Sequence, residues 1–154
     1  MSSKKYYKKR LYLFDFDNTL ANTAEIIKEQ GYGYQFSELR FYKKMLNIIS
    51  CRISRGNNVM ILSCRNKKFK QKILSSINEK IDYKLAVHLV PYHFLKFFYI
   101  LRFRLMSKLT IVDDMYRNEE NDDPKKLFFP KLKIPGVRYI IHNKVLKLRG
   151  NEIL

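Results

Sequence analysis

Four short apolar runs, each followed by polar residues, constrain the fold of this chain more than any other feature. They cover residues 11–16, 59–62, 85–90 and 109–112. Short runs of this kind are typical of buried strands, and segments with helical periodicity lie between them. Strands that alternate with helices favour an α/β fold with a mainly parallel sheet. We therefore predict one α/β domain over residues 11–154, preceded by a basic tail over residues 1–10.

Three segments repeat apolar residues every three or four positions, which predicts helices. The first extends from Leu39 to Ile53 with Ser37 as its N-cap, and the second follows a cap at Asn66. The third follows Pro91, and its predicted apolar face consists of Phe94, Phe97, Phe98, Leu101 and Leu105. Near the end of the chain, residues 137–141 and 145–148 are predicted to be extended, as one bent strand or as a hairpin.

The charge balance is strongly positive, with 31 Lys and Arg against 14 Asp and Glu, a formal net charge of +17. Such a surface attracts polyanions, and nucleic acid and an anionic membrane both fit the charge. No apolar stretch approaches the roughly 20 residues that a membrane span needs. The chain has two cysteines and no signal-peptide pattern. We therefore expect a reducing, cytoplasmic location and no membrane partner.

The few acidic residues lie where predicted strands end. Asp15 and Asp17 follow the first strand, and Asp113 and Asp114 follow the fourth. Ligands bind outside the carboxyl ends of the strands in an open parallel sheet, so we expect these four carboxylates to converge there. A hard divalent cation relieves their mutual repulsion, and Mg²⁺ is the usual ion where phosphate is handled.

Two further side chains complete the predicted site. Ser63 ends the second strand and supplies a hydroxyl group, and Lys96 lies near the start of the helix before the fourth strand and supplies a positive charge. Carboxylates, a metal ion, a hydroxyl and a lysine together suit phosphoryl transfer. In that reaction one carboxylate attacks the phosphorus, and the cations neutralise the phosphate oxygens.

This ordered set of Asp-x-Asp-x-Thr, Ser, Lys and Asp-Asp resembles the four motifs of the haloacid dehalogenase (HAD) superfamily of phosphohydrolases. The resemblance implies a three-layer Rossmann-like sandwich without a full cap domain, and a Mg²⁺-dependent phosphatase activity. It implies that Asp15 is the nucleophile that forms an aspartyl-phosphate, that Asp17 is the general acid and base, and that Thr19 orients their loop. It also implies that Ser63 and Lys96 contact the phosphoryl group. Asp113 and Asp114 would then bind Mg²⁺ together with Asp15 and the backbone carbonyl of Asp17. Either Asp113 or Asp114 is expected to contact the ion directly.

A narrower resemblance, to a capless branch associated with RNA repair, extends over roughly residues 11–122. That branch commonly has Thr-Gly-Arg at the second motif and Phe-Lys at the third. This chain has Ser63-Cys64-Arg65 and Phe94-Leu95-Lys96 instead. The change from glycine to cysteine keeps the hydroxyl and the arginine, whereas Leu95 shifts the lysine by one position. The final 30 residues have no counterpart in the branch.

The segments around the predicted site are too short for a full cap, which favours a large substrate that covers an open site. Together with the positive charge, this predicts terminal phosphates of RNA or DNA as the substrate. We predict that Arg65 and the tail residues Lys8, Lys9 and Arg10 bind that substrate. Two alternatives stay open: a phosphatase of proteins or small nucleotides, and a non-catalytic module that binds nucleic acid on a HAD scaffold.

Overall fold

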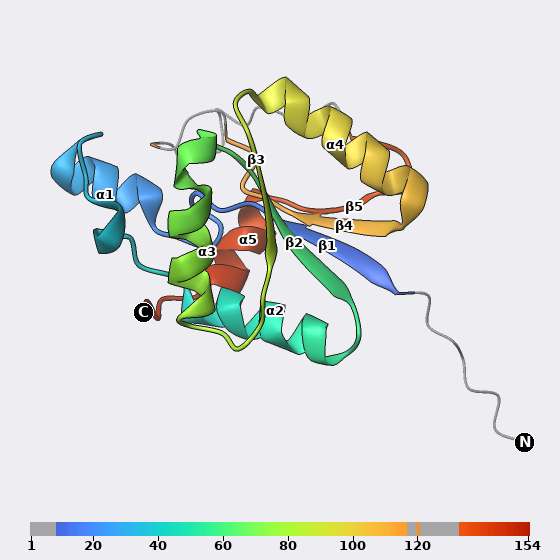
Figure 1. The fold of residues 1–154 in the computed structure, drawn as a ribbon, viewed down its shortest axis with the longest axis horizontal. Helices are drawn as coiled ribbons and strands as arrows, with labels where there is room; N and C mark the ends of the chain where they lie inside the picture. Colours follow the sequence, from blue (N-terminus) through green and yellow to red (C-terminus); the bar gives the residue numbers. More distant parts are fainter. Residues whose placement is uncertain (1–8, 117–119, 121–132) are drawn as a thin grey trace, which may run out of the picture.

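A five-stranded sheet with the order β3–β2–β1–β4–β5 organises the fold, and all its neighbouring strands are parallel (Figure 1). The structure is a computed structural model that describes residues 9–116, 120 and 133–154. The strands are β1 Arg10–Phe14, β2 Asn58–Cys64, β3 Ala86–Val90, β4 Lys108–Val112 and β5 Arg138–Ile140. The helices are α1 Thr23–Gln30, α2 Lys43–Ser54, α3 Lys70–Asn78, α4 His93–Met106 and α5 His142–Arg149, with short 3₁₀ helices η1 Phe36–Glu38 and η2 Lys67–Phe69.

All four predicted strands are present, and the prediction of an α/β fold with a mainly parallel sheet is confirmed. β1 ends at Phe14 rather than Phe16 because the chain turns there, and the backbone N–H of Leu20 donates to the carbonyl of Phe16 over 2.9 Å. Arg10 was assigned to the tail, but it is the first residue of β1. The first strand therefore begins one residue earlier than predicted.

Helices cover both faces of the sheet, which gives three layers. Phe14 belongs to the core beneath α2, α3 and α5, whereas Leu13 belongs to the core beneath α4. These neighbours face opposite sides because successive side chains of a strand alternate. Figure 1 shows α4 on the opposite side of the sheet from α2, α3 and α5. The result is a Rossmann-like sandwich whose strands all point toward one edge.

The end of the chain differs from the prediction. Residues 145–148 were predicted to be extended, but they lie inside helix α5. A run of four residues is too short for periodicity to separate a strand from a helix. The buried residues of α5 are His142, Val145 and Arg149, at spacings of three and four, so one helical face packs against the domain. The extended prediction holds only for the earlier segment, where β5 forms.

The predicted N-cap of the helix observed as α2 is also wrong. Ser37 lies in η1, and α2 begins six residues later at Lys43. The intervening chain is extended, because the backbone N–H of Tyr42 donates to Leu20 over 3.0 Å and so ties this segment to the end of β1. At the other predicted cap, the side chain of Asn66 accepts from the backbone N–H of Lys68 over 3.0 Å. Asn66 therefore caps η2, and α3 follows directly.

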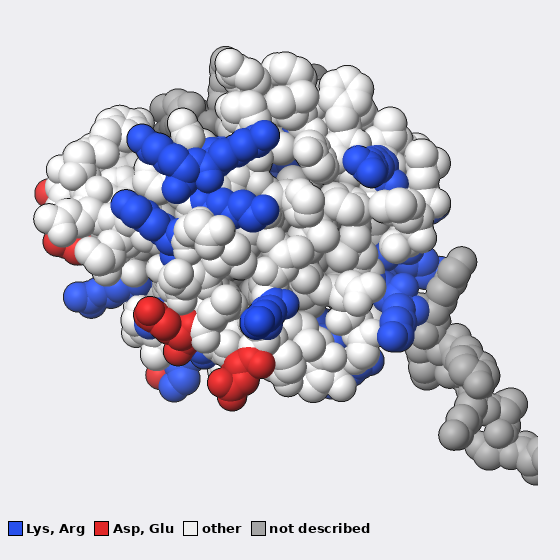
Figure 2. All heavy atoms as spheres, in the orientation of Figure 1, with Lys and Arg blue, Asp and Glu red and all other residues white. Residues whose placement is uncertain are grey.

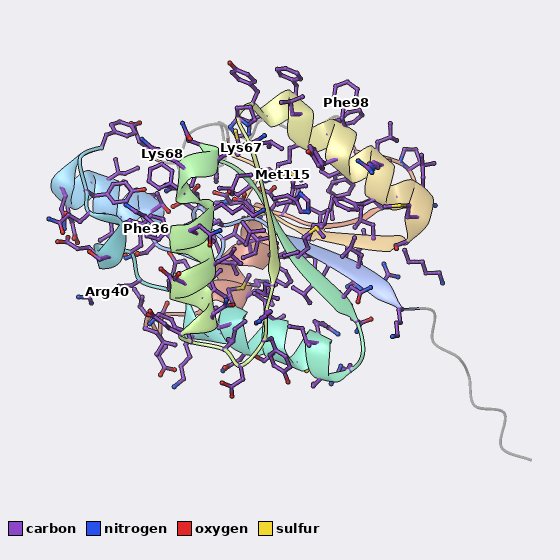
Figure 3. The ribbon with its side chains drawn as sticks, viewed as in Figure 1. Phe36, Arg40, Lys67, Lys68, Phe98 and Met115 are labelled. Atoms are coloured by element: carbon purple, nitrogen blue, oxygen red, sulfur yellow. The ribbon has the colours of Figure 1, made fainter. Side chains whose placement is uncertain are left out.

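Most of the predicted apolar face of α4 points away from the sheet, and of its five residues Phe97 alone packs, partly buried, against the core. Phe94, Phe98, Leu101 and Leu105 are all exposed, and Figure 3 shows Phe98 projecting from the outer side of the helix. The residues that α4 buries are Lys96 and Ile100. Phenylalanine and leucine occur on both sides of this helix, so the apolar pattern does not decide its orientation. Within the described ranges, no helix is long and apolar enough to cross a membrane.

This orientation predicts opposite outcomes for two truncations in α4. Ile100 is 7% exposed and Leu105 is 83% exposed. Ile100→Ala should lower the free energy of unfolding by about 2–5 kcal/mol, because it leaves a cavity in the core. Leu105→Ala should change it by less than about 0.5 kcal/mol. Urea denaturation of both variants measures the difference, and equal losses would contradict the orientation of α4.

Candidate active site

Strand register brings the ends of β1 and β4 together. Phe14 and Val112 are partners in the register of these parallel strands. The next residues, Asp15 and Asp113, therefore leave the sheet side by side, and the backbone N–H of Asp15 donates to the carbonyl of Val112 over 2.9 Å. The pairing of the two strands thus brings together Asp15 and Asp113. The fourth carboxylate expected at this point, that of Asp17, is not part of the cluster and pairs with Arg65 instead.

Three carboxylates meet at this edge of the sheet. Carboxylate oxygens of Asp15, Asp113 and Asp114 all lie within 4.8 Å of one another, and the three residues are buried. The hydroxyl of Thr19 accepts from the backbone N–H of Asp114 over 3.2 Å, so Thr19 fixes the loop after β1 to the loop after β4. A cluster of carboxylate oxygens of this size fits a hard cation such as Mg²⁺.

Lys96 lies at the centre of these charges. From the first turns of α4, its ammonium group donates to Asp15 over 2.9 Å and forms an ion pair with Asp113. Burial alone lowers the pKa of Lys96, but the carboxylates of Asp113 and Asp15 outweigh it and raise the pKa above its ordinary value. Lys96 thus carries one positive charge between the two carboxylates of Asp15 and Asp113, and this excess of negative charge favours binding of a further cation.

Burial also raises the pKa of Asp15 to about 7, against the opposing effect of the Lys96 charge. The charges of Asp113 and Asp17 raise the pKa further. The carboxylate form of Asp15 is therefore costly in the folded chain until positive charge reaches it. A divalent cation in the cluster supplies such charge.

Arg65 is buried beneath the surface rather than exposed at the mouth. Its guanidinium donates to Asp17 from Nη2 over 2.7 Å and from Nε over 3.0 Å, and it donates to the hydroxyl of Tyr34 over 2.5 Å. The hydroxyl of Thr23 donates to the same carboxylate over 2.7 Å. The guanidinium carbon lies 4.9 Å from the ring centroid of Phe69. These contacts make Arg65 a residue that positions Asp17, not one that presents its charge to solvent as predicted.

A double-mutant cycle measures this pairing. Arg65→Met should lower the free energy of unfolding by about 3–5 kcal/mol, because it leaves the carboxylate of Asp17 buried without its counter-ion. The loss should be smaller in an Asp17→Asn background, with a coupling energy above about 1 kcal/mol. Arg55→Met at an exposed position is the matched control. Additive effects of the two changes would show that the pair contributes nothing.

The other predicted residues divide between the two ends of the sheet. Ser63 is buried at the end of β2, on the same edge as Asp15. Arg10 begins β1 and so lies at the opposite end, where its guanidinium donates to the hydroxyl of Thr110 over 3.1 Å. Lys9 is exposed just before that strand. The structure therefore does not bring Arg10 to the site. Lys8 lies outside the described residues.

Two residues that the sequence did not indicate hold the loop after β1. Asn18 has a φ of 57°, in the left-handed region, and its side chain accepts from the backbone N–H of Ala24 over 2.6 Å. Arg149 of α5 is buried and donates to the backbone carbonyl of Asn18 over 2.6 Å. The four-residue spacing of Val145 and Arg149 is compatible with a helix and could have indicated α5. Nothing in the sequence indicates the contact of Arg149 with Asn18.

No family model matches the chain, and comparison with curated proteins and with solved structures found no match to it. The chemistry of the site is therefore inferred from its own geometry. That geometry combines a buried triad of carboxylates with a lysine, and a fourth carboxylate, Asp17, paired with Arg65.

Proposed function

We propose that this protein is a Mg²⁺-dependent phosphohydrolase of the HAD type, acting on terminal phosphates of nucleic acid. The observation that supports this function best is the buried cluster of Asp15, Asp113 and Asp114 around Lys96. Asp15, Lys96 and the adjacent pair Asp113 and Asp114 come from three separate segments of the chain, and the fold gathers their charges in its interior. Such an arrangement lowers stability unless a ligand uses it, so it favours a functional site over a structural one.

The carboxylates of Asp15, Asp113 and Asp114 fit Mg²⁺ by their chemistry, because this ion prefers oxygen ligands and often binds one or two carboxylates in sites that handle phosphate. When bound, Mg²⁺ neutralises phosphate oxygens and so lowers their repulsion of an attacking carboxylate. The ammonium group of Lys96 would contribute to the same neutralisation, and it stays protonated because the carboxylates of Asp113 and Asp15 raise its pKa.

The reaction proceeds in two displacements. A carboxylate oxygen of Asp15 attacks the phosphorus, and the bond from phosphorus to the leaving oxygen breaks while Asp17, in its carboxylic acid form, gives that oxygen a proton. The carboxylate of Asp17 then accepts a proton from water, which attacks the phosphorus and releases phosphate and free Asp15. Arg65 and Thr23 hold Asp17 throughout and stabilise the carboxylate left after proton donation. Ser63 binds a phosphoryl oxygen through its hydroxyl group.

Substrate size and charge favour nucleic acid ends. The segment between β1 and α2 contains only α1 and η1, which is much less than a cap domain. A large substrate therefore reaches the candidate active site more readily than it would if a cap domain covered that site. The formal net charge of +17 attracts polyanions to the protein as a whole.

Phosphate release from a panel of substrates tests the function. The panel contains 3′- and 5′-phosphorylated single-stranded oligonucleotides, an aryl phosphate and a phosphopeptide, each with Mg²⁺ and with a chelator. We expect Mg²⁺-dependent release, fastest from an oligonucleotide. Faster release from the phosphopeptide would favour the protein phosphatase alternative. Oligonucleotide binding without release from any substrate would favour the non-catalytic alternative.

A further inference from the structure

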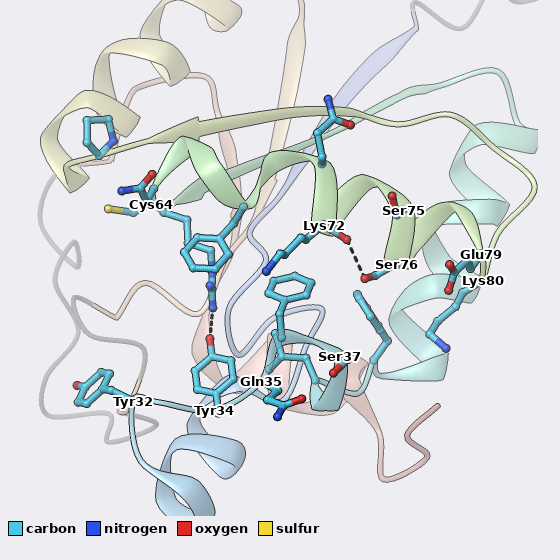
Figure 4. A pocket seen from close by; sticks show the side chains of 18 residues that line it. Tyr32, Tyr34, Gln35, Ser37, Cys64, Lys72, Ser75, Ser76, Glu79 and Lys80 are labelled. Atoms are coloured by element: carbon cyan, nitrogen blue, oxygen red, sulfur yellow. Dashed lines mark hydrogen bonds between the residues drawn. The ribbon is translucent and has the colours of Figure 1, made fainter.

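A groove runs beside the candidate active site, between α3 and residues 31–41 (Figure 4). Its volume is about 1080 Å³. At one end it is lined by Cys64 and Pro91, which stand at the carboxyl ends of β2 and β3, and its lining continues to Lys80 beyond the end of α3. Cys64 directly follows Ser63, so the groove begins at the edge of the sheet where the carboxylates meet.

The lining of the groove combines aromatic rings with positive charge. The aromatic rings are those of Tyr32, Tyr34, Phe36, Phe41 and Phe69, and the cationic side chains are those of Arg65, Lys72 and Lys80. Glu79 is the acidic residue in the lining. In Figure 4, Tyr32 and Tyr34 lie along one wall, and Lys72 extends from α3 into the groove. The ring of Tyr32 is 67% exposed and so is available to stack on a ligand.

The rim of the groove carries further lysines. Lys67 and Lys68 are exposed on η2, directly before α3. The ammonium of Lys68 lies 5.1 Å from the ring centroid of Phe69 in the groove wall. Figure 3 shows Lys67 and Lys68 at the end of α3 nearest the site, and Figure 2 shows Lys and Arg gathered over this part of the surface. Polyanions therefore meet positive charge along the rim before they reach the groove.

We propose that this groove binds the last nucleotides of a single-stranded polynucleotide, whose terminal phosphate then lies at Asp15. The proposal rests on the phosphatase function proposed above and assigns a place to its substrate. Unpaired bases stack on exposed aromatic rings such as that of Tyr32, and the backbone phosphates pair with Lys68 and Lys72. This surface takes the role that the sequence assigned to Lys8, Lys9 and Arg10.

Arg65 joins the groove to the chemistry. Arg65 is among the residues that line the groove although it is largely buried, and its guanidinium pairs with the carboxylate of Asp17 and donates from Nη2 to the hydroxyl of Tyr34. A nucleotide seated beside Tyr34 therefore lies next to the residue that positions the acid and base. Arg10, in contrast, lies at the opposite end of β1. The groove is the better placed of the two surfaces to hold a strand whose end is being hydrolysed.

Binding of an oligonucleotide that carries no terminal phosphate tests the groove without requiring turnover. The probe is a labelled single strand of about 8 nucleotides, within the range that one binding surface covers. Fluorescence anisotropy at several salt concentrations gives the dissociation constant and its salt dependence. Lys68→Ala/Lys72→Ala should weaken binding about tenfold and reduce the slope of log K against log salt by about 1.4, for two lost phosphate contacts on a single strand. Tyr32→Ala should weaken binding about tenfold with an unchanged slope.

Lys84→Ala/Lys108→Ala is the matched control, because it removes the same charge at the opposite end of the sheet, before β3 and at the start of β4. We expect it to weaken binding less than about twofold. Thermal melts check that every variant is folded. Equal loss of oligonucleotide affinity in the control and groove variants would overturn the proposal. So would groove variants that lose affinity for a phosphopeptide but bind the oligonucleotide normally. Because this assay needs no catalysis, its failure is distinct from absence of phosphate release by the unaltered protein.

Discussion

Asp15→Asn should lower phosphate release by at least about 10⁴-fold on every substrate that the protein hydrolyses, because an amide does not replace the attacking carboxylate. The variant should nevertheless stay folded. Burial raises the pKa of Asp15 to about 7, which shows that its charge is costly in the metal-free chain. The free energy of unfolding measured in a chelator should therefore be unchanged or higher in Asp15→Asn.

Steady-state kinetics measures the expected loss of phosphate release, and urea denaturation measures the free energy of unfolding. Asp82→Asn is the matched control, because Asp82 is an exposed carboxylate away from the cluster, and it should change neither quantity. Near-normal turnover by Asp15→Asn would exclude a covalent intermediate on this residue. Loss of folding in that variant would show instead that Asp15 has a structural role.

Lys96→Met should lower the free energy of unfolding by about 3–5 kcal/mol when Mg²⁺ is absent. Methionine keeps most of the length of the side chain but removes the charge between Asp15 and Asp113, and breaking a buried ion pair on one side costs about this much. Mg²⁺ should restore part of the loss, since the ion neutralises the same carboxylates. Turnover should also fall on small and large substrates alike, because the lost charge faces the phosphoryl group.

Urea denaturation in chelator and in Mg²⁺ measures this rescue. Lys144→Ala, at an exposed position of α5, serves as the control and should change stability by less than about 0.5 kcal/mol. A loss below about 1 kcal/mol in Lys96→Met would mean that the buried carboxylates do not depend on the lysine. Equal losses with and without Mg²⁺ would argue against a metal ion in the cluster.

The strands were predictable because each is a short apolar run that polar residues end. Among the helices, α1 was not predicted, and α4 and α5 were not described correctly. In α5, Val145 packs into the core and Arg149 donates to the loop after β1. Both contacts require the helical conformation of this segment, and they therefore stabilise it. In α4, Lys96 must face Asp15, and Ile100 lies one turn further on the same side. Because Lys96 faces Asp15, the apolar side of α4 on the far side of the helix is exposed. Apolar periodicity alone predicts the reverse, that this side is buried.

The position of the carboxylates was predictable for a different reason. The carboxyl ends of parallel strands share one edge, so residues after β1 and β4 meet whatever the details of the fold. The partners of those residues were not predictable. Arg65 pairs with Asp17 across 48 positions, and Arg149 contacts Asn18 across 131. No local pattern marks such contacts, and Arg65 was therefore interpreted as a surface residue rather than as part of the buried site.

Chemical trapping of the phosphorylated protein tests the central claim most directly. Asp17→Asn should slow the second displacement and so accumulate the phosphoryl group on Asp15. Borohydride reduces an acyl phosphate to an alcohol, so treatment after incubation with Mg²⁺ and a hydrolysed substrate should convert Asp15 into homoserine, which tandem mass spectrometry of the peptide identifies. We expect homoserine at position 15 and none in Asp15→Asn/Asp17→Asn. An unmodified Asp15 in a variant that still releases phosphate, or modification at another carboxylate, would contradict the proposed mechanism.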